Sequence, residues 1–184
     1  SCNTGLGYFT LKSNTTGHCN VAIGKEAMLG NTTGGCNVAL GPYALRYNTT
    51  GVHNYAVGNL SMQCSLSGNH NTAIGQQSLA YNYGGCCNAA IGYLALEKNT
   101  VGDKNFAVGP ETMRCNTTGQ KNIALGDTAL CKNTTGVNNI AIGSESSRFA
   151  LSANYNTAIG QQALYANYGG ACNTAIGYLS MQCN

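Results

Sequence analysis

An asparagine recurs every 17 residues along this 184-residue chain, and a glycine always follows it four residues later. If each asparagine is counted as position one of a coil, the consensus is N-x-A-[ILV]-G-x-x-[AST]-[LM]-x-x-N-T-T-G-x-x. A fixed short period is the signature of a repeat architecture, in which each unit buries its apolar face against its neighbours. Residues 1–184 are therefore predicted to form a single repeat array.

The chain also repeats with a longer period of 85 residues. The segment that begins at Asn71 returns 85 residues later at Asn156, so five coils make one super-unit. Residues 3–87 are one copy, residues 88–172 a second, and residues 173–184 the start of a third. Solenoids normally need polar capping repeats, and none stands at either end. We therefore expect the chain to be a segment of a longer repetitive molecule.

The length of the coil predicts the fold class. Seventeen residues are too few for a helical hairpin and suit one rung of a parallel β-solenoid with two short strands and two turns. Positions two to four, as in Val21–Ile23, are rich in β-branched residues and end at a glycine, whereas positions eight and nine, as in Ala44 and Leu45, supply a second apolar patch. We predict an all-β fold of eleven coils, about 50 Å long at about 4.8 Å per rung.

The asparagines of position one are predicted to stack into an amide ladder of the cross-β kind, with a structural role and not a ligand-binding one. Alanine fills position three in ten of the eleven coils, and a branched residue at position four points the other way. Which of the two sides is the interior stays open at this stage. The predicted ladder residues are Asn20, Asn37, Asn54, Asn71, Asn88, Asn105, Asn122, Asn139, Asn156 and Asn173.

The runs NTAIG, NVAIG and NIAIG, each followed by a small residue and a leucine, resemble the YadA-like head repeats of trimeric autotransporter adhesins and the related repeats of tail-fibre-like proteins. The resemblance covers essentially the whole chain. It implies a left-handed parallel β-roll, often trimeric, that serves as a rigid extracellular stalk or an adhesive head. The coil is longer than the family's usual repeat and richer in cysteine, so a distinct fibre that reuses the same rung is the alternative.

The ten cysteines all flank the NTTG turn. Their even number, with only 8% charged residues, indicates an oxidising setting, outside the cell or on a cell or virion surface. Positions eleven and seventeen are expected to face each other across the turn, within reach of a disulfide between neighbouring coils. The predicted pairs are Cys64 with Cys86 or Cys87, Cys115 with Cys131, Cys172 with Cys183, and two of Cys2, Cys19 and Cys36.

Metal binding is not predicted, because the chain has no CxxC pair and no zinc-like spacing. His53 and His70 share position seventeen in successive coils, and they are interpreted as exposed side chains. No cofactor is predicted either.

N-x-[ST] sequons predict N-linked glycans along one edge of the rod. The alternative is that NTTG is simply favourable turn chemistry. The candidate glycosylation sites are Asn14, Asn31, Asn48, Asn59, Asn116 and Asn133.

The composition does not favour nucleic-acid binding, a membrane span or catalysis. The net charge of +3 comes from nine thinly spread basic residues, so nucleic acid is not an expected partner. No apolar run of about 18 residues predicts a membrane span. The six carboxylates fall in different coils with no repeated pair, no other catalytic constellation stands out, and the chain is predicted not to be an enzyme.

The leading hypothesis is a structural extracellular fibre or adhesin stalk that self-assembles by coil stacking, as a head-to-tail filament or a homotrimer, and is stiffened by disulfides. The alternative is an adhesin head that binds surface glycans or a receptor through a tyrosine-rich edge. An ice-binding solenoid is a third hypothesis, although the paired threonines sit in a turn and not on a flat strand. The tyrosines of the edge are Tyr81, Tyr83, Tyr165 and Tyr168.

Overall fold

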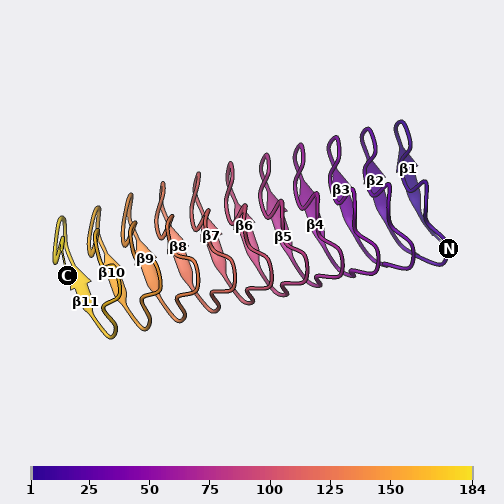
Figure 1. The fold of residues 1–184 in the computed structure, drawn as a ribbon. Coiled ribbons are helices and arrows are strands. Elements are labelled where there is room, and N and C mark those ends of the chain that lie inside the picture. Colours follow the sequence, from indigo (N-terminus) through magenta and orange to yellow (C-terminus); the bar gives the residue numbers. More distant parts are fainter. Residues whose placement is uncertain (1, 184) are drawn as a thin grey trace.

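The computed structural model describes residues 2–183 as a rod of stacked coils with the two ends of the chain at opposite ends of the rod (Figure 1). Each coil contributes one strand of three residues, and no helix occurs among the described residues. This is the predicted all-β parallel solenoid. The strands are β1 (Thr4–Leu6), β2 (Val21–Ile23), β3 (Val38–Leu40), β4 (Tyr55–Val57), β5 (Thr72–Ile74), β6 (Ala89–Ile91), β7 (Phe106–Val108), β8 (Ile123–Leu125), β9 (Ile140–Ile142), β10 (Thr157–Ile159) and β11 (Thr174–Ile176).

All eleven strands lie in one parallel sheet, ordered β1 to β11 as in the chain. Each residue pairs with the residue 17 places later, as Val21 does with Val38. The register therefore places equal positions of successive coils directly above one another. We call each such row of residues at one coil position a file.

The prediction of a second strand in each coil, at positions eight and nine, is wrong. Instead of extending, the chain places positions seven, nine and seventeen in the left-handed region, with φ between 46° and 61° in every described coil. These residues still bond between coils: Glu26 donates its N–H to the Tyr8 carbonyl (2.7 Å) and Leu45 to the Ser61 carbonyl (3.0 Å). The left-handed conformation costs a non-glycine residue roughly 1–2 kcal/mol. An inter-coil hydrogen bond of about 0.5–1.5 kcal/mol offsets much of that cost.

The interior lies on the alanine side of the sheet. Ala22 and Ala39, at position three, are fully buried, and so are Leu45 and Met62 at position nine. Positions two and four point outward, and Tyr55 at position two is 49% exposed. A core this thin takes a methyl group from the strand and one Leu or Met from the opposite wall, which explains why position three is almost always alanine.

Glycine recurs at two positions of the coil for different reasons: at position five in every coil, and at position fifteen in every complete coil except the one where Ala153 stands. Gly24, at position five, has a φ of 128°, and a Cβ there would lie 2.6 Å from the backbone of Gly41 in the next coil. Gly34, at position fifteen, needs no positive φ, but a Cβ there would lie 2.4 Å from the Gly51 carbonyl oxygen. The close stacking of coils thus favours glycine at this position of the NTTG turn.

Candidate functional site

The asparagines of position one form a buried ladder through the length of the rod. Asn54 donates its backbone N–H to Asn37 Oδ1 (2.8 Å) and its Nδ2 to the Gly68 carbonyl (2.7 Å) of its own coil. Asn71 repeats the backbone bond to Asn54 Oδ1 (3.0 Å). Each side chain therefore closes the turn of its own coil and binds the next coil at the same time.

A second buried ladder, which the sequence analysis missed, runs along position twelve. Asn48 donates its Nδ2 to Asn31 Oδ1 (2.8 Å) and to the Gly51 carbonyl (3.2 Å). The signal for it is the near-invariant asparagine of NTTG, for which the sequence predicts a glycan or a turn role but no bond between coils. The members of this ladder are Asn14, Asn31 and Asn48, then Asn82, Asn99, Asn116 and Asn133, with Asn167 in the last full turn.

Two coils interrupt the second ladder. Ser65 and Ala150 stand at position twelve where the degenerate turns occur, and both are buried. Among the described residues, the Oδ1 atoms of Asn48 and Asn133, which precede these gaps, are buried without a hydrogen-bond partner. The gaps therefore leave one unpaired acceptor each.

The side chains of four of the six candidate glycosylation sites belong to the position-twelve ladder and have no exposed surface, which weighs against glycans there. A glycan would have to be attached to an Nδ2 that is buried and already donates hydrogen bonds. Asn14 and Asn59 are only half-buried, and glycans there stay a prediction. The four buried sites are Asn31, Asn48, Asn116 and Asn133.

The first threonine of the NTTG turn also bonds between coils. Thr32 donates its hydroxyl to the Thr49 carbonyl (3.0 Å), and Thr117 does the same to the Thr134 carbonyl (3.0 Å). These hydroxyls are directed along the rod axis and are used within the fold. They do not present a flat, free threonine face, and this weighs against ice binding.

The outer face of the sheet carries exposed apolar side chains along the rod. Position four contributes Ile23 and Ile74, while position two contributes Tyr55 and Phe106, and all four are exposed. Apolar patches of this kind on a soluble surface mark a site for packing against another molecule.

Of the predicted cysteine pairs, the structure brings together Cys115 with Cys131 and, in the position-seventeen file, Cys19 with Cys36, whose sulfur atoms lie within 4.8 Å of each other. Cys115 donates its backbone N–H to the Cys131 carbonyl (3.0 Å), and Cys131 is buried. Burial raises the pKa of the Cys131 thiol, and the neighbouring Cys115 adds to the shift. All ten cysteines, which lie within residues 2–183, are unbridged in this structure, so the pairing stays a prediction.

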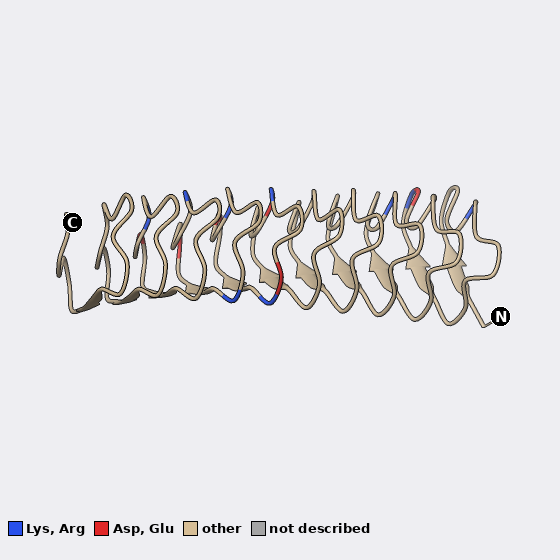
Figure 2. Ribbon diagram, turned by 60° about the horizontal axis from the view of Figure 1, so that its bottom comes forward, with Lys and Arg blue, Asp and Glu red and all other residues tan. Residues whose placement is uncertain are grey.

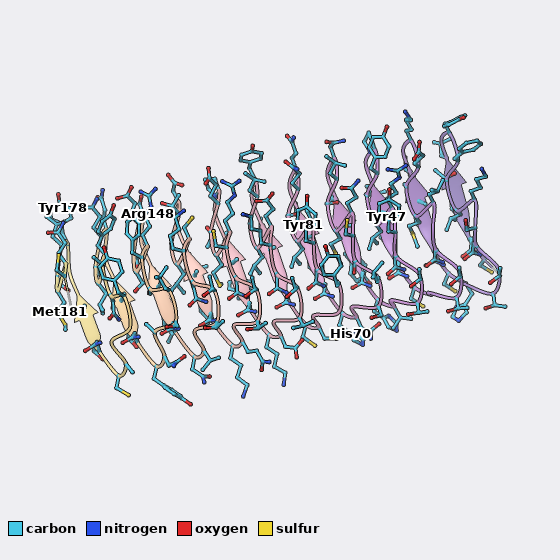
Figure 3. The ribbon with its side chains drawn as sticks, in the orientation of Figure 1. Tyr47, His70, Tyr81, Arg148, Tyr178 and Met181 are labelled. Atoms are coloured by element: carbon cyan, nitrogen blue, oxygen red, sulfur yellow. The ribbon has the colours of Figure 1, made fainter. Side chains whose placement is uncertain are left out.

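The predicted pairs across the turn, Cys172 with Cys183 and Cys64 with Cys86 or Cys87, would join residues of different files. Cys183 pairs with Ala166 in the position-eleven file, whereas Cys172 donates its N–H to the Asn154 carbonyl (3.1 Å) at the end of the previous coil. Figure 3 shows the same separation, because Tyr47 and Tyr81 of position eleven lie at a different level of the coil from His70 of position seventeen. Stacking thus aligns equal positions and does not set position eleven opposite position seventeen.

Cys64 and its proposed partners follow the same pattern. Cys64, at position eleven, donates its N–H to the carbonyl of Ala80, at position ten of the next coil (2.8 Å). Burial raises the pKa of its thiol. Cys86 instead donates its N–H to Asp103 Oδ1 (2.7 Å) at position sixteen.

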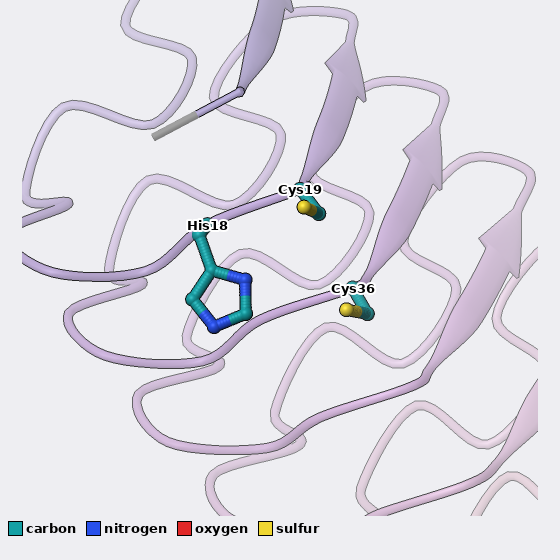
Figure 4. Close-up of side chains that lie close together, drawn as sticks. All are labelled: His18, Cys19 and Cys36. Atoms are coloured by element: carbon teal, nitrogen blue, oxygen red, sulfur yellow. The ribbon is translucent and has the colours of Figure 1, made fainter.

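A group of possible metal ligands lies at the start of the rod (Figure 4). One ligand atom from each of His18, Cys19 and Cys36 lies within 4.8 Å of the others. His53 and His70, two coils further on, are exposed as predicted, and their rings stack at 4.9 Å with an angle of 8°. The position-seventeen file therefore holds thiol and imidazole groups in consecutive coils.

Charged side chains are sparse along the rod (Figure 2). Arg114 donates hydrogen bonds to the carboxylates of Glu97 (2.7 Å) and Glu111 (3.2 Å), and the bond that it donates to Glu97 is the main cause of its raised pKa. Arg148 pairs with Glu145 (2.8 Å). These carboxylates are engaged in ion pairs, within or between coils. Residues 2–183 enclose no pocket, and they include no helix long and apolar enough to cross a membrane.

Comparisons of the chain with protein-family models, with curated proteins and with solved structures gave no match. The fold is therefore described by its own coil geometry. The resemblance to YadA-like repeats bears on function only as part of the proposal below.

Proposed function

We propose that this chain is a structural rod, a stretch of an extracellular or surface fibre or adhesin stalk. The observation that carries the proposal is the continuity of inter-coil bonding. The backbone bonds and the position-one asparagine ladder run from coil to coil, and the position-twelve ladder and the threonine bonds add to them in most of the described coils. The resemblance of the NTAIG runs to YadA-like repeats supports the same role.

The ladders explain how such a rod would resist bending. Asn116 donates its Nδ2 to Asn99 Oδ1 (2.7 Å), and Asn105 donates its backbone N–H to Asn88 Oδ1 (2.9 Å), on two separate files of the same pair of coils. Bending would stretch one of these files, and a buried amide that loses its partner costs roughly 1–3 kcal/mol. A Cys115–Cys131 disulfide would add a covalent link between neighbouring coils.

Self-assembly would use the same bonds. Val21 donates its N–H forward to the Asn37 carbonyl (2.9 Å), while Gly24 donates backward to the Leu6 carbonyl (2.8 Å). Each coil thus offers equivalent donors and acceptors on both of its faces. A further coil, from the same chain or from another copy, would continue the pattern.

Negative-stain electron microscopy of the purified chain over a range of concentrations tests this assembly. We expect filaments one rod wide that lengthen with concentration. Thr174→Pro should shorten them, because it removes a backbone N–H at the position that donates forward in earlier coils, whereas Thr174→Val keeps that N–H and should assemble normally. Rods of constant length at every concentration would contradict the self-assembly.

A homotrimer is the other form of self-association that the exposed sheet face favours. Tyr55 and Phe106 would be buried if three rods packed through this face. Analytical ultracentrifugation distinguishes the two forms, because a trimer has three times the 19.0 kDa mass of the chain at all concentrations, whereas a filament has no fixed mass.

An adhesin head is the second candidate function, and exposed aromatic rings favour it. Tyr81, Tyr83 and Tyr168 are exposed, whereas Tyr165 packs edge-on against Phe149 at 5.2 Å. Exposed rings with a polar tip suit contact with sugars. A glycan array probed with the purified chain tests this role, and binding should be lost in the double variant Tyr81→Ala, Tyr83→Ala.

A further inference from the structure

The imidazole and thiol groups of this chain are concentrated at two of the seventeen positions of the coil. All three histidines and six of the ten cysteines occupy positions sixteen and seventeen. Parallel stacking turns residues 17 places apart into direct neighbours, as in the pairing of Val21 with Val38 just after this edge. In the coils before Asn88 this edge is a row of thiol and imidazole groups, with Cys172 as a single later member. Its members are Cys2, His18, Cys19, Cys36, His53, His70, Cys86, Cys87 and Cys172.

Three of these side chains converge. The ligand atoms of His18, Cys19 and Cys36 lie within 4.8 Å of one another. In Figure 4 the two sulfur atoms lie on the side of their coils from which the imidazole ring extends. Cys36 donates its backbone N–H to the His18 carbonyl (2.9 Å), which fixes the register of the two coils at this point.

The absence of a side chain at Gly35 makes room for the imidazole. Gly35 is one coil above His18 at the same position, and a Cβ there would lie 3.2 Å from His18 Cε1 and 3.4 Å from Nδ1. The ring can therefore lean over the next coil and lie beside Cys36. A disulfide between two cysteines would need no such third group.

We propose that His18, Cys19 and Cys36 bind a zinc ion, with a water molecule as the fourth ligand. Thiolate and imidazole are the ligands that zinc prefers, at about 2.3 Å for sulfur and about 2.0–2.1 Å for nitrogen. Tetrahedral angles then place ligand atoms about 3.3–3.8 Å apart. His18 and Cys19 are exposed and Cys36 is half-buried, so side-chain rotations that move the ligand atoms by about one ångström bring them from within 4.8 Å of one another to these distances. Binding releases the protons of the two thiols to solvent.

The experiment uses the full chain, reduced and freed of metal, titrated with Zn²⁺ against a chromogenic chelator and separately with Co²⁺. We expect one tight site and a thiolate-to-cobalt charge-transfer band. Because loss of even an outer-shell partner typically costs 10–100-fold in affinity, Cys19→Ser or Cys36→Ser should weaken binding by about 100-fold or more, and His18→Gln by at least about tenfold. Cys172→Ser is the matched control, since it removes an exposed thiol of the same file whose neighbour at position seventeen of the preceding coil is Tyr155 and not a cysteine, and it should bind normally.

A positioning variant tests the geometry without touching a ligand. Gly35→Ala places a methyl group against the imidazole and should weaken zinc binding while the far-ultraviolet circular dichroism stays that of wild type. The proposal is overturned if the double variant Cys19→Ser, Cys36→Ser binds zinc as tightly as wild type. It is equally overturned if the reduced chain shows no thiolate-to-cobalt band, or if peptide mapping of the native protein finds Cys19 and Cys36 joined to each other.

Discussion

Filling the first gap in the position-twelve ladder should stabilise the rod. Asn48 Oδ1 and the Ser65 hydroxyl are both buried and have no hydrogen-bond partner among the described residues. The backbone at the gap matches that of an intact coil, because Ser65 donates its N–H to the Met62 carbonyl at 3.1 Å and Asn48 does so to Leu45 at the same distance. The variant Ser65→Asn can therefore adopt the ladder conformation without moving the main chain.

The size of the effect follows from the bonds gained. The new Nδ2 would reach Asn48 Oδ1 and the Gly68 carbonyl, as Asn48 itself reaches Asn31 (2.8 Å) and Gly51 (3.2 Å). Each net hydrogen bond contributes about 0.5–1.5 kcal/mol, and a buried acceptor regains its partner. We expect a gain of about 1–3 kcal/mol in the free energy that protects these coils.

Hydrogen exchange followed by mass spectrometry is the suitable assay, because repeat arrays can open locally and need not unfold in two states. Protection should rise in peptides that cover Asn48 to Gly68. Asn99→Ser makes the opposite change, since Asn99 donates to Asn82 Oδ1 (2.7 Å) and accepts from Asn116 (2.7 Å), and it should lower protection by a similar amount.

Ser67→Asn is the matched control for this prediction. Ser67 is exposed in the same turn, so the change should stay within about 0.5 kcal/mol. If Ser65→Asn leaves exchange unchanged or accelerates it while the circular dichroism stays native, the reasoning about the ladder is refuted.

Three further predictions concern packing, reactivity and modification. Gly24→Ala should destabilise the rod by about 3 kcal/mol or more in urea titration, because its Cβ would meet the backbone of the next coil, whereas Gly169→Ala, with no atom within 4 Å, should have little effect. Cys131 should react with iodoacetamide more slowly than the exposed Cys172 at pH 8, because burial raises its pKa and lowers its thiolate fraction; its rate should rise as the pH increases, and equal rates in a peptide time course would count against this. Secretion from eukaryotic cells should leave Asn31 unglycosylated in peptide mass mapping of the folded protein, since its amide is buried, and a glycan found there would contradict the ladder.

Much of the fold could be predicted from the period alone. The 17-residue spacing of asparagine predicts the position-one ladder that includes Asn54. The β-branched residues that follow each of these asparagines predict the strand at Val21–Ile23. The interior could also have been inferred. Position two varies from Thr72 to Phe106, as an outward position can, whereas a wall that must accept Leu45 in a thin core permits only a residue as small as alanine or glycine at position three.

The left-handed residues, the position-twelve ladder and the His18 cluster depend on contacts between coils, which local sequence patterns do not reveal. Leu45 has a φ of 49°, which no propensity scale suggests for a leucine, so the second strand was predicted where the chain turns. Asn31 was interpreted as an exposed turn residue, but its amide bonds along the rod. The cluster of His18 with Cys36 joins residues of different coils, and only the observed register shows that they meet.

Cryo-electron microscopy of the assembled protein tests the central claim most directly, namely that 17-residue coils stack in register on buried asparagine ladders to make a rod. We predict rungs about 4.8 Å apart along the particle axis, one coil per rung, with Asn54 and Asn48 inside the wall. Compact particles without that axial spacing, or a map in which these asparagines face solvent, would contradict the account.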